Sequence, residues 1–374
     1  VLLAMLLVVS ASYRLAGQDP ARTSDRSRSL PADARAVLER IVEAVAGGKL
    51  AGGDAWLRWD SHFLKGPAGK TYVPYTVTID EAPGRFRAMA VYVRVLRRGQ
   101  REERSKNMVG LPTGAVPVNV PERNFAPPGA PTAGENSAVL ASLTAELARG
   151  PVGYAFEDGY SLDMPAGGAR ESPRFQRAFA LDPGDYDVYV AVRERAAGRG
   201  AEPKSAVLKR ELTVPDLSSG GLRMSSVILA NRVETIDRPL SKAEQTLRPY
   251  ALGTVEIVPA PAAEFRPDVT LTAAFIVYNA GTDAQGKPDV TVQYLLYEQS
   301  GGLERLLGTT PPQALNAATL PPAFDLRAGH QLAPMHSLPL AAYRPGAYRL
   351  DIRVIDNLTG ARIGDSATFT IATP

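Results

Sequence analysis

The sequence contains no cysteine, and it has few of the other residues that commonly carry enzymatic chemistry. Without cysteine the chain forms no disulfide, carries no thiolate nucleophile and offers no sulfur ligand to a metal. It also lacks the cysteine to which the lipid of a bacterial lipoprotein is attached. Stability must therefore come from hydrophobic cores, and domains of ~150 residues are large enough to supply them.

Histidine is almost as scarce, with His62, His330 and His336 as the three examples. Zinc sites need three or four ligands, and their paired histidines are commonly three to five residues apart. His330 and His336 are six residues apart in an expected loop. The Gly-x-Ser-x-Gly elbow, the phosphate loop and the dinucleotide fingerprint are also missing from the sequence. We therefore expect a protein that is not an enzyme, with no catalytic, cofactor-binding or metal-binding residue.

Acidic residues cluster in the segment FEDGYSLDMP, which contains Glu157, Asp158 and Asp163. Paired carboxylates can bind calcium or hydrolyse glycosidic bonds, so a hydrolase with a dispersed carboxylate site is one alternative. The sequence favours a turn with solvated acids instead. The segment between Asp283 and Asp289 lacks the alternating oxygen ligands of a calcium loop.

An excess of one charge is missing too, because 42 basic and 39 acidic residues leave a net charge of +3. The densest basic stretch runs from Arg94 to Lys106 and contains Glu102 and Glu103. It follows an alternating strand pattern, which favours a solvated hairpin tip over a contact with a polyanion. We expect no nucleic-acid partner, because nucleic-acid binders concentrate their basic residues on one face or helix.

Tryptophan occurs twice, as Trp56 and Trp59. Such large side chains usually bury much of their surface and anchor the edge of a domain. A platform that stacks on a sugar ring is the alternative, and it makes a glycan the second candidate partner.

The N-terminus carries an uninterrupted apolar run, VLLAMLLVV, at residues 1–9. Residues 1–17 resemble the apolar and cleavage regions of a signal peptide, with an uncleaved anchor as the alternative. The run is shorter than the ~20 apolar residues that span a bilayer. We expect a bacterial protein that is secreted, periplasmic or on the cell surface, and that meets a membrane only through this segment if it is not cleaved.

Residues 18–52 combine a polar segment with a predicted amphipathic helix at 31–46. Its apolar residues recur at helical spacing and form one stripe, and Gly47 and Gly48 end it; the stripe is Val37, Leu38, Ile41, Val42 and Val45. Residues 112–135 are rich in proline, glycine and alanine and predict a long loop, followed by a short helix near 136–148.

The rest of the chain alternates apolar and polar residues with period two, which predicts β-strands. A first domain at 53–216 is expected to hold strands near 72–79, 86–96, 175–181, 186–193 and 205–214. A second domain at 221–374 is expected to hold strands near 222–230, 253–258, 269–278, 290–297, 348–355 and 366–371. Many short strands without regular intervening helices predict a mainly β protein with two tandem immunoglobulin-like β-sandwich domains.

An internal repeat supports two related domains. The segment PGDYDVYVAV at 183–192 recurs as PGAYRLDIRV at 345–354, 162 residues later. In each copy Pro-Gly turns the chain into a strand, and a tyrosine begins the inward face. Tyr186 and Tyr348 are expected to form tyrosine corners, in which the hydroxyl bonds nearby backbone.

Three segments carry a resemblance to a known group of proteins. They are LPLAAYRPGAYRLDIRVIDNLTGARIGDSATFTI near the C-terminus, HFLKGPAGKTYVPYTVTID in the first domain and ELTVPDLSSGGLRMSSVILA at the domain boundary. They resemble the non-catalytic β-sandwich regions of uncharacterised secreted bacterial proteins, including the GWxTD-domain and von Willebrand factor A-related groups. The chain has no GWxTD motif.

The resemblance implies a secreted interaction protein. Together with the composition, it leads us to expect a non-enzymatic structural component of an envelope or extracellular assembly, with a protein partner or self-assembly.

Overall fold

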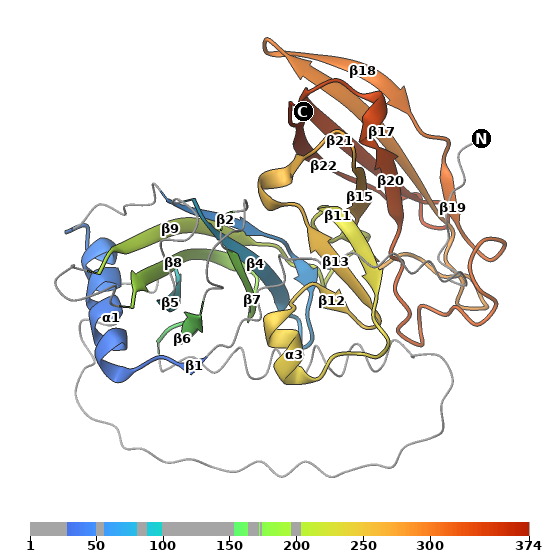
Figure 1. The fold of residues 1–374 in the computed structure, drawn as a ribbon. Coiled ribbons are helices and arrows are strands. Elements are labelled where there is room, and N and C mark those ends of the chain that lie inside the picture. The colour runs from blue at the N-terminus through green and yellow to red at the C-terminus, as the bar shows by residue number, and fades with distance from the viewer. Residues whose placement is uncertain are drawn as a thin grey trace.

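The computed structural model describes residues 28–49, 56–80, 88–98, 153–163, 172, 174–195 and 203–373. Within them the chain is mainly β and folds into two sandwiches of mostly antiparallel strands, with one long helix on the first (Figure 1). The predicted fold class is confirmed. The apolar segment at 1–17, the loop at 112–135 and the helix at 136–148 lie outside the described residues.

The first sandwich consists of two sheets. One has the strand order β1-β6-β5-β8-β9, and the other has β2 and β3 on one side of β4 and β7 on its other side. The strand bounds are β1 Arg28–Ser29, β2 Leu57–Ser61, β3 Leu64–Lys65, β4 Thr71–Ile79, β5 Ala88–Arg97, β6 Phe156–Asp163, β7 Arg174–Leu181, β8 Gly184–Glu194 and β9 Ser205–Val214.

Strand β5 shows why this segment forms a strand within a buried sheet. Met89, Val91, Val93 and Val95 point into the core between the two sheets, as their period-two spacing predicts. The alternate residues face the opposite side and meet a helix there, so the strand is covered on both faces.

Helix α1, Ala32–Ala46, supplies that cover. Leu38 and Val42 are fully buried and pack on Ala90, Tyr92 and neighbouring apolar residues of the outer sheet face. The predicted stripe is therefore confirmed except for Val37, which is half-buried outside this cluster, and it packs against the first sandwich.

The second sandwich also has two main sheets, with strand orders β12-β13-β11-β15-β20 and β14-β22-β21-β17-β18, plus the short pair β10-β16 and β19 on β17. The bounds of its elements are β10 Arg223–Met224, β11 Ile228–Thr235, α3 Lys242–Leu247, β12 Ala251–Leu252, β13 Val255–Pro259, η1 Pro261–Ala263, β14 Glu264–Phe265, β15 Thr270–Ala274, β16 Val277–Tyr278, β17 Val290–Ser300, β18 Leu303–Thr309, β19 Gln313–Leu315, β20 Met335–Pro339, η2 Leu340–Ala342, β21 Gly346–Asp356 and β22 Arg362–Ile371.

The two sandwiches share one topology. In the first, β6-β5-β8-β9 form one sheet while β2, β4 and β7 form the other; in the second, β18-β17-β21-β22 and β11, β15, β20 take the same places in the same chain order. Strands β8 and β21 start and end 162 residues apart, which is the offset of the sequence repeat. The repeat therefore marks equivalent strands of two immunoglobulin-like sandwiches.

Both predicted tyrosine corners are present. The hydroxyl of Tyr186 donates to the carbonyl of Asp182 at 2.8 Å, and that of Tyr348 donates to the carbonyl of Arg344 at 2.7 Å. Each tyrosine thus closes the turn that leads into its strand by bonding four residues upstream. The ring remains buried in the core of its own sandwich.

The repeat also explains why, among the described residues, a helix covers this outer sheet face in the first sandwich and not in the second. Tyr189 and Ala191 of β8 lie under α1, and the equivalent positions 162 residues later are Asp351 and Arg353. Charged residues at those positions remain hydrated at little cost, whereas apolar ones require a cover. In the described part of the chain, the second sandwich accordingly has no helix over this face.

Two predicted strands are each interrupted. The segments at 222–230 and 269–278 divide into β10 and β11, and into β15 and β16. At the interruption the N–H of Ser225 donates to the carbonyl of Ile276, and the N–H of Ile276 donates to the Ser225 hydroxyl, both at 2.9 Å. A serine side chain thus replaces one ladder bond, which hydrophobic periodicity does not reveal.

The two sandwiches are docked through a buried junction. The N–H of Ser226 donates to the carbonyl of Phe63 at 3.0 Å, and the N–H of Phe63 donates to the Ser226 hydroxyl at 2.9 Å. Around this pair, apolar residues from both sandwiches and the linker form one cluster: Leu64, Tyr72, Ala178, Leu217, Ile276 and Tyr278. Buried apolar packing and paired backbone groups fix how the two halves sit together.

Candidate functional site

The three histidines occupy three different environments. His62 lies at the junction, where its Nδ1 is 2.9 Å from the hydroxyl of Tyr250. His330 lies in a loop and accepts the N–H of Asp325 through Nδ1 at 2.8 Å, while His336 stacks on a tyrosine ring of β17. Across the described residues, no group of three or more His, Cys, Asp or Glu side chains is arranged to hold a metal ion.

The acidic segment FEDGYSLDMP is not a turn, and its expected solvation is wrong for Glu157. Residues 156–163 form strand β6, in which Phe156, Tyr160 and Leu162 point into the first core. Glu157 is nearly fully buried on the opposite face, where Arg94 lies 3.3 Å away and the hydroxyl of Tyr92 donates to it. A partner contributed by another strand makes burial of this carboxylate tolerable.

The carboxylates of β6 do not form a glycosidase pair. Glu157 and Asp158 are adjacent in the strand, so their side chains point to opposite faces of the sheet. Glu157 and Asp163 share a face, but six residues of strand separate them by roughly 20 Å, beyond the roughly 9.5 Å limit for inverting pairs.

Arg94 differs from the predicted solvated hairpin tip. Its side chain is buried, its Nε donates to the Tyr92 hydroxyl at 2.8 Å, and its guanidinium lies 4.1 Å from the centre of the Tyr154 ring. Burial, followed by the hydrogen bond to Glu157, raises the pKa of Tyr92. This cluster joins β5 and β6 to α1. Residues 99–106 of the basic stretch lie outside the described residues.

The two tryptophans pack against the first core instead of forming an open platform. The ring of Trp59 stacks on Tyr75 with centroids 4.3 Å apart, and on Phe179 at 6.2 Å. Trp56 is partly buried against the same core. The expected anchoring role is what this packing provides.

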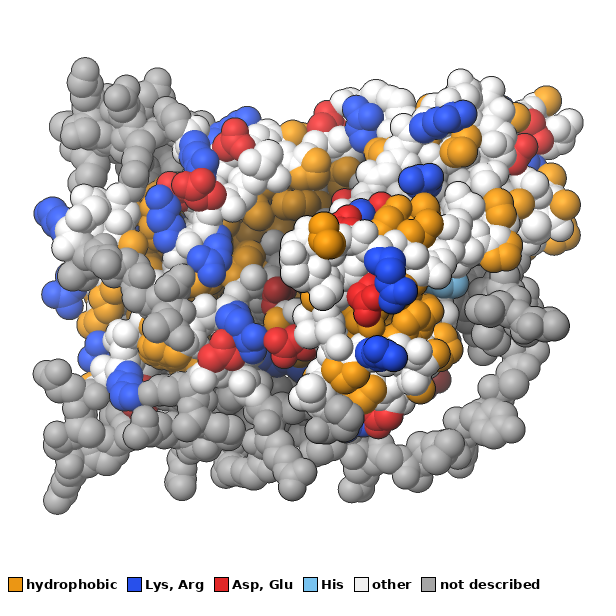
Figure 2. Space-filling model, turned by 90° about the horizontal axis from the view of Figure 1, so that it is seen from above, with side chains coloured by type: hydrophobic (Ala, Val, Ile, Leu, Met, Phe, Trp, Pro, Cys, Tyr) orange, Lys and Arg blue, Asp and Glu red, His pale blue; other side chains and the backbone are white. Residues whose placement is uncertain are grey.

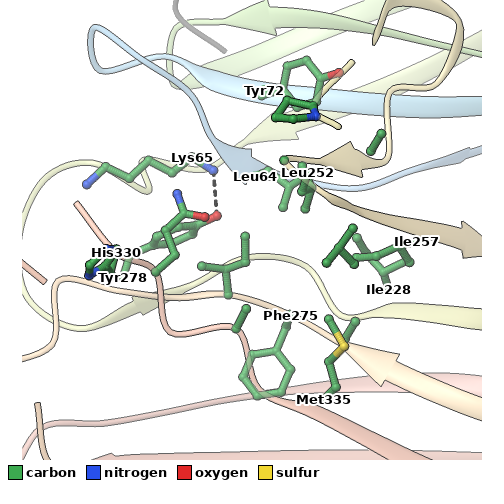
Figure 3. A pocket seen from close by; sticks show the side chains of 18 of the residues that line it. Leu64, Lys65, Tyr72, Ile228, Leu252, Ile257, Phe275, Tyr278, His330 and Met335 are labelled. Carbon is green, nitrogen blue, oxygen red and sulfur yellow. Dashed lines mark hydrogen bonds between the residues drawn. The ribbon is translucent and has the colours of Figure 1, made fainter. Parts of the chain in front are cut away.

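A cavity of about 400 Å³ lies at the junction. The outer face of sheet β12-β13-β11-β15-β20 forms one wall, and Leu64, Lys65 and Tyr72 of the first sandwich form part of another. Figure 3 shows Lys65, Tyr278 and His330 together on one side of it, with Ile228, Ile257 and Met335 on the other.

Sequence reasoning missed this cavity, because its lining comes from segments far apart in the chain. A signal for it exists in the runs VILA at 227–230 and AAFIVY at 273–278, which are apolar at consecutive positions. Such runs are typical of strands that are buried on both faces. Here one face belongs to the core of the second sandwich and the other to the junction.

Among the described residues no strand pairs with the outer edge of β18, which lies along the outer side of the second sandwich (Figure 1). Leu303 and Leu306 of this strand are 78% and 50% exposed. Its charged residues are paired within the sheet, Glu304 with Arg349 at 2.6 Å and Arg305 with Glu298 at 2.6 Å.

On the face of the molecule seen in Figure 2, basic and acidic side chains are interspersed and hydrophobic side chains gather in a central hollow.

No family model matches the chain, and no curated protein matches it. Among solved structures, the chain is similar to the native conformation of E. coli alpha-2-macroglobulin determined by cryo-EM, with 12% identity. The match covers 85% of this chain and 16% of that protein, with a TM-score of 0.19. A likeness at this level carries no argument about fold or function.

The resemblance to GWxTD-domain and von Willebrand factor A-related proteins therefore stays a prediction. In the described part of the chain, no helix has the length and apolar character needed to span a membrane.

Proposed function

We propose that this chain is a non-enzymatic interaction protein of the bacterial periplasm or cell surface. Two docked immunoglobulin-like sandwiches present the edge strand β18 to a protein partner or to a second copy of the chain. The observation that carries the proposal is a seven-residue open edge with Leu303 and Leu306 exposed. The apolar run at residues 1–9 supports export from the cytoplasm.

The chemistry of an open edge favours strand addition. Folded proteins usually protect such edges with very short strands, proline, bulges or unpaired charges. Strand β18 contains no proline, and its charged residues pair with β17 and β21 instead of facing outward alone. Its pairing with β17 has one bulge, at Leu307, so the regular part of the edge is residues 303–306. An added strand would bond the free backbone groups and cover the exposed leucines.

The docked junction supports a structural role. The linker between the sandwiches is held by Asp216, which accepts the N–H groups of Ser218 and Ser219 at 2.9 Å. A hydrogen bond from Ser219 leads the contacts that lower the pKa of Asp216 to about 2. Because the angle between the two domains is fixed, a partner bound at one edge takes a defined position relative to the rest of the assembly.

A photocrosslinking experiment tests this proposal. A photoreactive amino acid replaces Leu306 in the full chain, expressed in its native envelope, with the same replacement at Leu358 as a control. Leu358 is 47% exposed but lies in the turn between β21 and β22. We expect one discrete crosslinked species from position 306, lost when Leu303 is changed to lysine, and none from position 358.

The same variants separate the two kinds of partner. If purified chain associates in sedimentation and Leu306→Lys abolishes this, the partner is a second copy. If purified chain is monomeric and crosslinks appear in the envelope alone, the partner is another protein. Equal crosslinking from positions 306 and 358, or none from 306, would contradict the proposal.

A further inference from the structure

The junction cavity has one polar side and one apolar side. Ile228 and Ala274 come from neighbouring strands of the second sandwich, and Ile257 and Met335 extend the apolar wall. Volumes of about 300–1,000 Å³ with mainly apolar walls and a few convergent polar groups are typical of small-molecule sites, and this cavity falls in that range at about 400 Å³.

The polar side of the junction cavity carries hydrogen-bond donors. Tyr278 is 6% exposed, and its hydroxyl accepts the backbone N–H of Lys65 at 3.0 Å. Among the described residues, the hydroxyl proton of Tyr278 has no acceptor, although a buried donor normally has one. The cavity is where a ligand could provide that acceptor.

Two further donors lie on the same side of the cavity as this hydroxyl. The ammonium of Lys65 lies 5.9 Å from the centre of the Tyr278 ring and has one partner among the described side chains, Asn279 at 3.3 Å. His330 accepts a backbone N–H through Nδ1, so its ring proton is on Nε2, which remains a donor. The three donors come from different segments and lie on the same side of the cavity, where the Lys65 ammonium is at the far end of its side chain from the Tyr278 hydroxyl (Figure 3).

The charged residues that line the cavity favour an anionic ligand. Among the described residues that line the cavity there is one lysine and no aspartate or glutamate. A ligand anion placed there would meet a cation and two further hydrogen-bond donors, without a carboxylate to repel it. A ligand cation would meet the ammonium of Lys65 and no compensating charge.

We propose that the junction cavity binds a small amphipathic anion, with an acyl-type apolar body against Ile228, Ile257 and Met335 and a carboxylate-like head at Lys65 and Tyr278. The ligand contacts both sandwiches, so its binding also strengthens their docking. This site is separate from the open edge of β18. If the cavity binds no such ligand, the proposed protein interaction at β18 is unaffected.

Calorimetry on the full chain tests the charge and the apolar body with defined probes. The probes are octanoate, decanoate, dodecanoate, 1-dodecanol, dodecyltrimethylammonium and dodecanoyl lysophosphatidate, each used below its micelle concentration or solubility limit. We expect one saturable site for dodecanoate and affinity that rises about fourfold per methylene along the carboxylate series. Dodecyltrimethylammonium should bind at least about tenfold more weakly than dodecanoate.

Variants connect these results to the cavity. Lys65→Met keeps the apolar stem and should weaken dodecanoate about tenfold while changing 1-dodecanol about twofold or less. Ala274→Leu places three extra carbons in the cavity and should weaken every probe. Lys209→Met is the matched control, because Lys209 pairs with Asp187 on the first sandwich, away from the cavity. Circular dichroism checks that each variant is folded.

The outcomes decide the proposal without relying on any one variant. Equal affinity for the anionic and cationic probes, affinity independent of chain length, or the absence of a saturable site for both dodecanoate and dodecanoyl lysophosphatidate would overturn it. If Ala274→Leu binds the probes as tightly as the natural chain does, the ligand does not bind in this cavity. If the lysophosphatidate binds and free dodecanoate does not, the anionic acyl class holds and its source is a lipid.

Discussion

His62 of the first sandwich and Tyr250 of the second share a hydrogen bond across the junction, with 2.9 Å between Nδ1 and the hydroxyl oxygen. The same hydroxyl donates to the carbonyl of Pro74 at 3.3 Å, so the shared proton comes from the imidazole. Burial lowers the pKa of His62 to about 4. A neutral histidine is thus part of the contact between the two halves.

This relationship predicts a pH dependence of stability. The native pKa of about 4 is below the ordinary value of 6.5, so the unfolded chain binds more protons between these values. Stability should therefore fall as pH falls from about 6.5 to 4, by up to about 3 kcal/mol. Urea unfolding of the natural chain and of His62→Gln at several pH values measures this contribution.

The variant should flatten the slope in that window. Asp60 lies two residues before His62, at the end of β2, and its pKa is raised mainly by burial. A raised carboxyl pKa favours the native state at low pH, which is the opposite sign, so the difference between the two proteins isolates His62. Identical slopes of unfolding free energy against pH in the two proteins would show that burial at the junction does not shift the pKa of His62.

The tyrosine corners predict equal losses in both sandwiches. Tyr186→Phe and Tyr348→Phe each remove one hydroxyl-to-carbonyl bond without changing the ring, at a cost of about 1 kcal/mol of unfolding free energy. Tyr294→Phe is the control, because its buried hydroxyl has no hydrogen-bond partner among the described residues and should be lost without penalty. Chemical denaturation gives all three values, and a penalty for Tyr294→Phe as large as the others would argue against the assignment.

Ser226 predicts how strongly the sandwiches are coupled. Ser226→Ala leaves the N–H of Phe63 without its acceptor at the junction, which should cost about 1–3 kcal/mol. Scanning calorimetry should show two separated unfolding transitions in the variant where the natural chain shows one. Ser366→Ala, at an exposed position of β22, should change nothing. Two transitions already present in the natural chain would refute strong coupling.

Helix α1 predicts a further effect on the first sandwich. Leu38→Ala removes a fully buried side chain from the contact with Ala90 and Tyr92 and should cost about 2–4 kcal/mol. Arg40→Ala, on the exposed side of the helix, should stay within about 0.5 kcal/mol. Proteolysis within residues 31–46, followed over time, should accelerate in the first variant and not in the second.

Much of the fold follows from local pattern. The stripe at Leu38 and Val42, the alternation of β5 and the repeated Pro-Gly-x-Tyr segments each predict an element that the structure contains, because each pattern records which face of one element is buried. The candidate site does not follow in this way. Lys65, Tyr278 and His330 carry no common motif, and each comes from a different segment.

The sequence by itself determined that this protein is mainly β, that it repeats one sandwich topology and that a helix needs an apolar face to cover. The tertiary structure alone decided that Glu157 and Arg94 are buried together, that Ser226 bonds Phe63 and that a cavity lies at the junction. The physical reason is range: periodicity reports the burial of neighbours along one element. The free energy of a buried charge or of a shared cavity depends on partners many residues away.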